Sequence, residues 1–196
     1  MPANGTSHEG AFPVLRTPRL LLRQPVPHDA EALARIMRDP RVHRYHVSSA
    51  LQGPNEALDA IHSLHRAYLA GQAVVWAIEL HRTGSLIGTC GLYALAPGCT
   101  HAEVAVFLDS AHWGRGIPLE LAPVVSAFAR GVLRLSEFHA LVDPLNRNAI
   151  RMIQRIGFRR RAQADTGTGT TVVPLGMELH ILPLGGTAPP DGTLST

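Results

Sequence analysis

The most informative absence in this chain of 196 residues is lysine, since all 18 of its basic side chains are arginine. A P-loop needs a lysine and a Ser or Thr at the end of its glycine-rich loop, so that class of nucleotide site is excluded. Only two cysteines are present, Cys90 and Cys99, which are too few for a disulfide framework or a cysteine-based metal site. We expect Cys90 to be a small core residue, because it lies within an apolar strand pattern.

Long apolar runs and aromatic residues are also scarce. No run approaches the ~20 residues of a membrane-spanning helix, and the N-terminus lacks the basic and apolar regions of a signal peptide, so we expect a cytoplasmic protein with no membrane partner. No aromatic residue is interleaved with the one basic run, Arg159–Arg161, which favours an exposed edge strand over a nucleic-acid contact. The eleven histidines show no ligand spacing, which predicts no metal site.

Length and composition suit one domain with a sizeable core, at 45% hydrophobic residues. We expect a flexible N-terminus over residues 1–12, a single domain over 13–182 and a disordered Pro/Gly-rich tail over 183–196. The net charge of +3 permits an anionic ligand.

The stretch from Ala111 to Glu120 places two glycines, Gly114 and Gly116, where predicted strands give way to a predicted helix. Glycine allows backbone N–H groups to approach an anion closely, and the N-terminus of a helix adds unpaired N–H groups and a positive dipole end. This pattern predicts a phosphate-binding loop. A dinucleotide fingerprint is excluded because a third glycine is missing, and Leu119 stands in its place. From the glycines alone, a turn without a ligand stays open.

A second segment, from Asp143 to Phe158, is typical of a capped helix. Asn146 or Asn148 can cap its start, and Gly157 lies where a C-terminal glycine belongs. Three isoleucines repeat on one face, at positions 150, 153 and 156.

The remaining elements follow from apolar periodicity and from turn residues. Strands are expected at 19–24, 74–80, 85–95, 101–108, 137–142, 158–164 and 171–182, and helices at 28–39, 55–70 and after the glycine loop, with an irregular piece at 41–53. The alternation from Val74 predicts a strand with one face in the core, and Pro123 predicts a kink or a late start in the helix after the loop. This order predicts an α+β fold with a mixed, mostly antiparallel sheet and helices on both faces.

Five segments occur in an order and spacing that resemble a known superfamily. They are Thr17–Arg23, Ala102–Val104, Trp113–Ile117, Asn146, and Gly157 with Phe158. Together they resemble the GNAT superfamily of acyl-CoA N-acyltransferases and, within it, the Rim-type (RimJ/RimL-like) enzymes that acetylate N-termini of ribosomal proteins. The resemblance covers roughly residues 15 to 182.

The resemblance implies direct transfer of an acetyl group from acetyl-CoA to a primary amine through a ternary complex, without an acyl-enzyme. The strand that ends at the glycine loop and the next strand would splay apart, with the pantetheine arm between them. The implied cofactor-binding residues are Phe107, Leu108, Trp113, Gly114, Arg115, Gly116, Ile117 and Asn146. Tyr45, His46 and Tyr68 are candidate substrate contacts near the acceptor entrance, although core packing or a solvated surface also explains them. Tyr93 is a further candidate substrate residue.

Glu103 is the candidate catalytic residue. Its carboxylate stands in an otherwise apolar strand, where burial would raise its pKa, and the resemblance implies a base that deprotonates the amine. An ordinary solvent-facing position on an amphipathic strand is the alternative. Asn146 likewise matches a residue that hydrogen-bonds the pantetheine arm, and a helix cap is an equal and compatible interpretation.

Two residues depart from the Rim-type pattern. Ala149 replaces a serine that is placed to protonate the leaving thiolate. Either water or a neighbour such as Tyr93 protonates the thiolate instead, or the thiolate leaves without a proton donor. Pro118 replaces Gly or Ala and removes one N–H from the anion site. These departures keep open a non-catalytic CoA-binding module and a small-molecule amine acetyltransferase. A protein N-terminal amine is the favoured acceptor, because its pKa near 8 leaves it partly neutral. A homodimer stays open.

Overall fold

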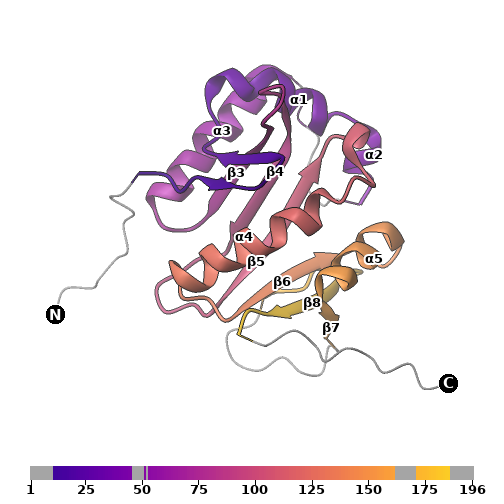
Figure 1. Cartoon of the computed structure of the whole chain (residues 1–196). Helices are drawn as coiled ribbons and strands as arrows, with labels where there is room; N and C mark the ends of the chain where they lie inside the picture. Colours follow the sequence, from indigo (N-terminus) through magenta and orange to yellow (C-terminus); the bar gives the residue numbers. More distant parts are fainter. Residues whose placement is uncertain (1–10, 46–50, 52, 162–170, 186–196) are drawn as a thin grey trace.

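The computed structural model describes residues 11–45, 51, 53–161 and 171–185. An eight-stranded sheet of order β1-β2-β3-β4-β5-β6-β8-β7 forms its centre (Figure 1). The strands are β1 (Leu15–Arg16), β2 (Leu20–Arg23), β3 (Val74–Leu80), β4 (Leu86–Tyr93), β5 (His101–Leu108), β6 (Glu137–Val142), β7 (Arg159–Arg160) and β8 (Glu178–Pro183). Only β5 and β6 pair in parallel among these strands, so the predicted mixed, mostly antiparallel sheet is confirmed.

Helices cover both faces of the sheet, as predicted. They are α1 (Ala30–Met37), α2 (Pro40–His43), α3 (Pro54–Leu69), α4 (Ile117–Gly131) and α5 (Arg147–Ile156), with short 3-10 turns at Pro27–Asp29 and Ser110–His112. One apolar cluster joins α1 and α3 to the sheet, and a larger cluster joins α4 and α5 to the opposite face (Figure 1). No helix of the described residues is long and apolar enough to span a membrane.

The two helical layers correct the prediction that β3 buries only one face. Trp76 faces α4, with its ring centroid 5.4 Å from that of Phe128, and it is fully buried. Val75 and Ala77 on the other face are buried as well. The alternation of large and small side chains in β3 therefore reflects two packed layers rather than one packed and one wet face.

Both ends of α5 follow the predicted capping. The Asn146 side-chain oxygen accepts a hydrogen bond from the Ala149 N–H at 3.1 Å, so Asn146 rather than Asn148 is the N-cap. Gly157 ends the helix with a φ of 118°, a left-handed conformation that glycine adopts at little cost.

Of the kink or late start that Pro123 predicts for α4, the late start is wrong. The helix begins at Ile117, directly after Gly116, and Pro123 lies inside it. Pro118 occupies the second helical position, where a backbone N–H has no partner within the helix. Its ring therefore costs the helix no ladder bond.

Both predicted domain boundaries exclude residues that belong to the packed structure. Phe12 lies 4.8 Å from the ring of Tyr68, centroid to centroid. Pro183 ends β8, and the next residue, Leu184, is buried and donates its N–H to the Ser136 carbonyl at 2.7 Å. The predicted C-terminal boundary of the domain, before residue 183, is thus too early. The Pro/Gly-rich composition from that residue onward predicts a tail, although residues 183 and 184 still pair with the sheet and its neighbouring loop. Residues 1–10 and 186–196 lie outside the described residues.

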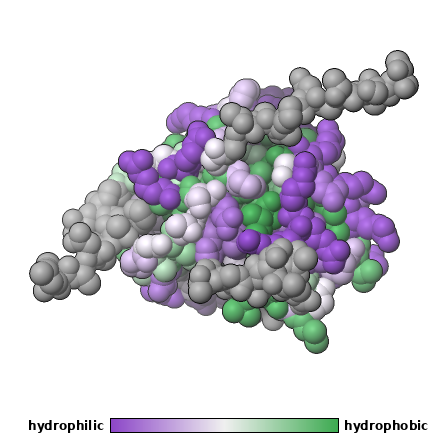
Figure 2. Space-filling view, turned by 90° about the horizontal axis from the view of Figure 1, so that it is seen from below, coloured by the Kyte–Doolittle hydropathy of each residue, from purple (hydrophilic) through white to green (hydrophobic). Residues whose placement is uncertain are grey.

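The closing hairpin is confirmed, with shorter strands than predicted. Arg159 pairs with Ile181 and Arg160 with His180, and both arginines are exposed on the edge strand β7. The predicted turn around residues 166–169 lies outside the described residues. On the underside of the molecule, hydrophilic side chains border a central apolar area (Figure 2).

Candidate functional site

The site begins where β5 and β6 part. The two strands pair over three residues of each, His101–Glu103 with Glu137–His139, and β5 then continues to Leu108 beside β4 alone. A cavity of about 250 Å³ lies at this divergence and is lined mainly by apolar side chains of β5, β6, α4 and α5. The splay implied by the resemblance is therefore present in the fold.

Glu103 lies on the wall of this cavity, at the residue where the pairing of β5 changes partner. It is opposite Tyr93 on β4 and opposite His139 on β6. Burial raises the pKa of the Glu103 carboxyl, and the nearby His139 offsets part of that rise. The raised pKa expected from the sequence is confirmed. A carboxylate with such a pKa is suited to accept a proton.

Tyr93 lines the same cavity and lies over Gly91. A Cβ atom added at Gly91 would come within 2.7 Å of the Tyr93 hydroxyl and closer still to its ring, so the glycine makes room for this side chain. Burial, with a smaller contribution from Cys90, raises the pKa of Tyr93 to about 12. The phenol therefore keeps its proton at neutral pH. Cys90 is buried as predicted, and burial raises the pKa of its thiol to about 12.

The other candidate substrate residues divide between cavity and core. Tyr45, just after α2, lines the cavity. Tyr68 is buried and packs against Phe12 in the core. His46 lies outside the described residues.

The N-terminus of α5 brings two of the sequence-identified residues to the cavity, Asn146 and Ala149. The Asn146 oxygen accepts the hydrogen bond of the helix cap, and the NH₂ group of the same amide is a donor that the cap does not use. Ala149 supplies only a methyl group.

The glycine loop lies beyond the end of β5, and its residues Trp113–Ile117 do not line the cavity. Pro118, the next residue, does. Gly114 and Gly116 have φ values of 72° and 71°, and a Cβ at either would meet no atom within 4 Å. The left-handed backbone, rather than crowding, therefore explains these glycines. The Trp113 indole N–H donates to the Leu108 carbonyl at 3.0 Å and ties the loop to β5.

Three side chains that hold this loop in place had no assigned role in the sequence analysis. Arg19 donates from Nε to Glu120 at 2.5 Å and from Nη2 to the Arg115 carbonyl at 3.1 Å. The Thr17 hydroxyl donates to the other oxygen of Glu120 at 2.5 Å. Burial alone would raise the pKa of Glu120, but these hydrogen bonds outweigh it and hold the pKa below its ordinary value. Glu120 therefore stays ionised in the first turn of α4, and Arg19 compensates its negative charge beside the loop.

A second group escaped the sequence analysis. His101 lies on β5 and the pair Glu137 and His139 on β6, and no spacing along the chain brings His101 to that pair. Their shared place depends on the β5–β6 register, which composition does not reveal.

Comparison with known proteins agrees with this geometry. A family model described as "Acetyltransferase (GNAT) domain" matches residues 19–159. The uncharacterized N-acetyltransferase YoaA of Bacillus subtilis is 32% identical over 149 residues, which are 76% of this chain and 84% of that protein. Mycobacterium smegmatis RimJ, in complex with CoA-disulfide, has a TM-score of 0.71 at 16% identity, over 87% of this chain and 86% of its own. RimL, a ribosomal L7/L12 alpha-N-protein acetyltransferase in complex with coenzyme A, has a TM-score of 0.70 at 17% identity, over 89% of this chain and 98% of its own.

Proposed function

The chain belongs to the GNAT acetyltransferase family, and from that premise we propose that it transfers an acetyl group directly from acetyl-CoA to a primary amine. The observation that carries the proposal is the apolar cavity between the diverging strands β5 and β6, with the half-buried carboxylate of Glu103 on its wall. The coenzyme A bound in two solved structures of this fold supports acetyl-CoA as the donor.

Backbone directions along β5 decide which residues can hold the pantetheine arm. The Thr100 carbonyl accepts from the Ser136 N–H at 2.7 Å, on the side of β6, whereas the Asp109 N–H donates to the Ile87 carbonyl at 2.8 Å, on the side of β4. Because these directions alternate along a strand, the even-numbered residues of β5 direct their backbone groups toward β6.

Beyond Glu103, that side of β5 is the gap. The backbone groups that face it belong to Val104, Val106 and Leu108, and the Leu108 carbonyl is engaged by Trp113. Phe107, expected from the resemblance to pair with the arm, directs its backbone toward β4 instead. We therefore assign the pairing with the amide groups of pantetheine to Val104 and Val106, with the Leu108 N–H as a further donor.

The glycine loop supplies the anion site. The N–H groups of Gly114, Arg115, Gly116 and Ile117 donate to no group among the described residues, and they lie at the N-terminus of α4, a helix of 15 residues. Such groups bind pyrophosphate well. Pro118 contributes no N–H, which removes a bond of about 1.5–3 kcal/mol if a relative makes it. The Arg115 side chain adds positive charge, and Arg19 compensates the negative charge of Glu120 in the first turn of α4.

In the transfer step the amine nitrogen attacks the thioester carbon, and the carbon–sulfur bond breaks. Glu103 accepts the proton that the amine loses, directly or through a water molecule. Tyr93 gives its hydroxyl proton to the departing thiolate and regains one from solvent. Ala149 offers no proton, and Tyr93 is protonated and lies beside Glu103 in the β4–β5 register, so it is the assigned donor.

The favoured acceptor is a protein or peptide N-terminal α-amine. Its pKa near 8 makes fewer demands on one carboxylate than a lysine amine near 10.4 does. The alpha-N-protein activity named for the RimL structure supports the same class. A non-catalytic CoA-binding module is the second candidate, favoured by the methyl group at Ala149 and the missing N–H at Pro118.

Release of free thiol from acetyl-CoA, followed with a peptide amine and with a lysine side-chain amine, tests this proposal. Glu103→Gln should lower turnover by about 10²- to 10⁴-fold and leave acetyl-CoA affinity nearly unchanged. Glu31→Gln, at an exposed position on α1, is the matched control and should keep full activity. Tight acetyl-CoA binding without thiol release for any amine would instead identify the non-catalytic module.

A further inference from the structure

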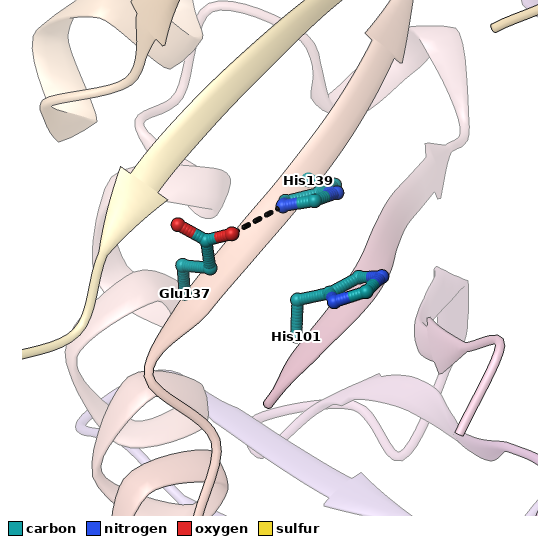
Figure 3. Close-up of side chains that lie close together, drawn as sticks. All are labelled: His101, Glu137 and His139. Atoms are coloured by element: carbon teal, nitrogen blue, oxygen red, sulfur yellow. Dashed lines mark hydrogen bonds and ion pairs between the residues drawn. The ribbon is translucent and has the colours of Figure 1, made fainter. Parts of the chain in front are cut away.

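Three side chains with metal-binding groups meet on the sheet outside the cavity. His101 begins β5, and Glu137 and His139 lie on β6 (Figure 3). One ligand atom from each lies within 4.8 Å of the other two. None of the three lines the acetyl-transfer cavity, so the mechanism above does not use them.

Strand pairing places these residues on one face of the sheet. His101 is in register with Glu137, and His139 follows Glu137 by two residues, so its side chain points to the same face. β8 pairs with β6 on its other side and fixes it further, through Glu137 with Pro183 and His139 with Ile181. The backbone of the cluster is therefore held in place, and only side-chain rotation can adjust it.

His139 is oriented as a metal-binding histidine is. Its ring is buried, with Nδ1 2.7 Å from the Thr171 hydroxyl and Nε2 2.8 Å from a Glu137 carboxylate oxygen. When Nδ1 donates its proton to Thr171, the Nε2 lone pair and the carboxylate face each other, and a proton or a cation must lie between them. A metal-binding imidazole usually donates its other ring N–H to an acceptor that fixes the tautomer, and the Thr171 hydroxyl is placed to be that acceptor here.

His101 supplies the third group. Its ring stacks on that of His139, with centroids 4.3 Å apart and planes 14° from parallel (Figure 3). In stacked rings the nitrogen lone pairs lie in parallel planes. Shared binding of one ion therefore requires the half-exposed His101 ring to rotate.

We propose that His101, Glu137 and His139 bind one divalent transition-metal ion, with zinc the best match. Two imidazoles and one carboxylate are the donor set of zinc sites that keep a fourth position for water, and Mg²⁺ and Ca²⁺ prefer all-oxygen sets. This inference goes beyond acetyl transfer and does not depend on it. Glu103 is the register neighbour of His139, so the bound cation would lie near the proposed base.

Calorimetric titration of the chelator-treated full chain with Zn²⁺ tests the site, with Co²⁺ as the spectroscopic probe. We expect one ion per chain and the visible absorption of four-coordinate Co²⁺. Loss of a group that supports a metal ligand typically weakens metal binding by about 10- to 100-fold, and Thr171→Val should weaken Zn²⁺ binding within that range. His101→Ala and Glu137→Gln each remove a proposed ligand, so each should weaken Zn²⁺ binding at least as much.

His81→Ala is the matched control, because His81 is exposed in the turn between β3 and β4. The Zn²⁺ affinity of this variant should equal that of the native chain. His101 and Glu137 are not fully buried, so their variants should fold, and circular dichroism checks this. No binding by the folded native chain, or binding that both variants retain at full strength, would overturn the proposal.

Discussion

The first three residues of β5 are paired with β6, whereas the stretch from Glu103 to Leu108 is paired with β4. Where β5 and β6 pair, their side chains are held close enough for His101, Glu137 and His139 to meet. Where they part, the edge of β5 that faced β6 has no partner among the described strands, and an apolar cavity lies beside it. Of the strand's eight described residues, Glu103 alone has a register partner on both sides. One strand thus offers a fixed cluster at one end and space for a ligand at the other, with the proposed base between them.

The largest expected effect at the open end comes from Tyr93. Tyr93→Phe should lower turnover by about 10²-fold or more, because the thiolate then loses its proton donor. Adding Ala149→Ser should restore part of the loss, since it returns a hydroxyl to the cavity wall from α5. Steady-state thiol release measures both variants. Full activity of Tyr93→Phe would exclude Tyr93 from proton transfer.

A large side chain placed in the cavity should remove the ligand space at the open end of β5. Ala122 lines the cavity from α4, and Ala122→Phe should weaken acetyl-CoA binding by about tenfold or more by occupying the space of the arm. Ala127→Phe, on the same helix at an exposed position outside the cavity, is the matched control. Calorimetry compares the two. Equal affinities would mean that acetyl-CoA binds elsewhere.

The pH dependence sharpens the role of Glu103. Its pKa is raised by burial, so the carboxylate is lost at a higher pH than an ordinary glutamate would lose it. Turnover should therefore rise with pH through this raised pKa and fall about tenfold for each pH unit below it. An acid limb that survives unchanged in Glu103→Gln would assign that titration to another group.

The smallest effect concerns the support of the glycine loop. Glu120→Gln should reduce unfolding free energy by about 0.5–1.5 kcal/mol in urea denaturation, since it loses the ion pair with Arg19 and the charge of the carboxylate that accepts the Thr17 hydrogen bond. The pKa of Glu120 is lowered in the folded chain, so this contribution is present above its unfolded pKa and is lost as the pH falls through the folded one. The native and variant chains should therefore converge in stability at acid pH. A constant difference would contradict the assignment.

Local signals predicted local structure well. The cap at Asn146, the left-handed Gly157 and the glycine loop before α4 are each decided by residues a few positions apart, and all three are present. The raised pKa of Glu103 followed from one carboxylate in an apolar strand.

Features that depend on register could not be predicted in the same way. Thr17 and Glu120 are 103 residues apart, and only the folded sheet brings them together. The His101, Glu137 and His139 cluster depends on the parallel pairing of two strands. Assigning the pantetheine pairing to Val106 rather than Phe107 needs the hydrogen-bond direction at each residue, which side-chain identity does not carry.

Calorimetric titration of the native chain with acetyl-CoA, beside desulfo-CoA and dephospho-CoA, tests most directly whether the gap between β5 and β6 is the donor site. We predict saturable binding of one molecule per chain that weakens when the thioester or the 3′-phosphate is absent. No binding at millimolar acetyl-CoA by the folded chain would contradict the account.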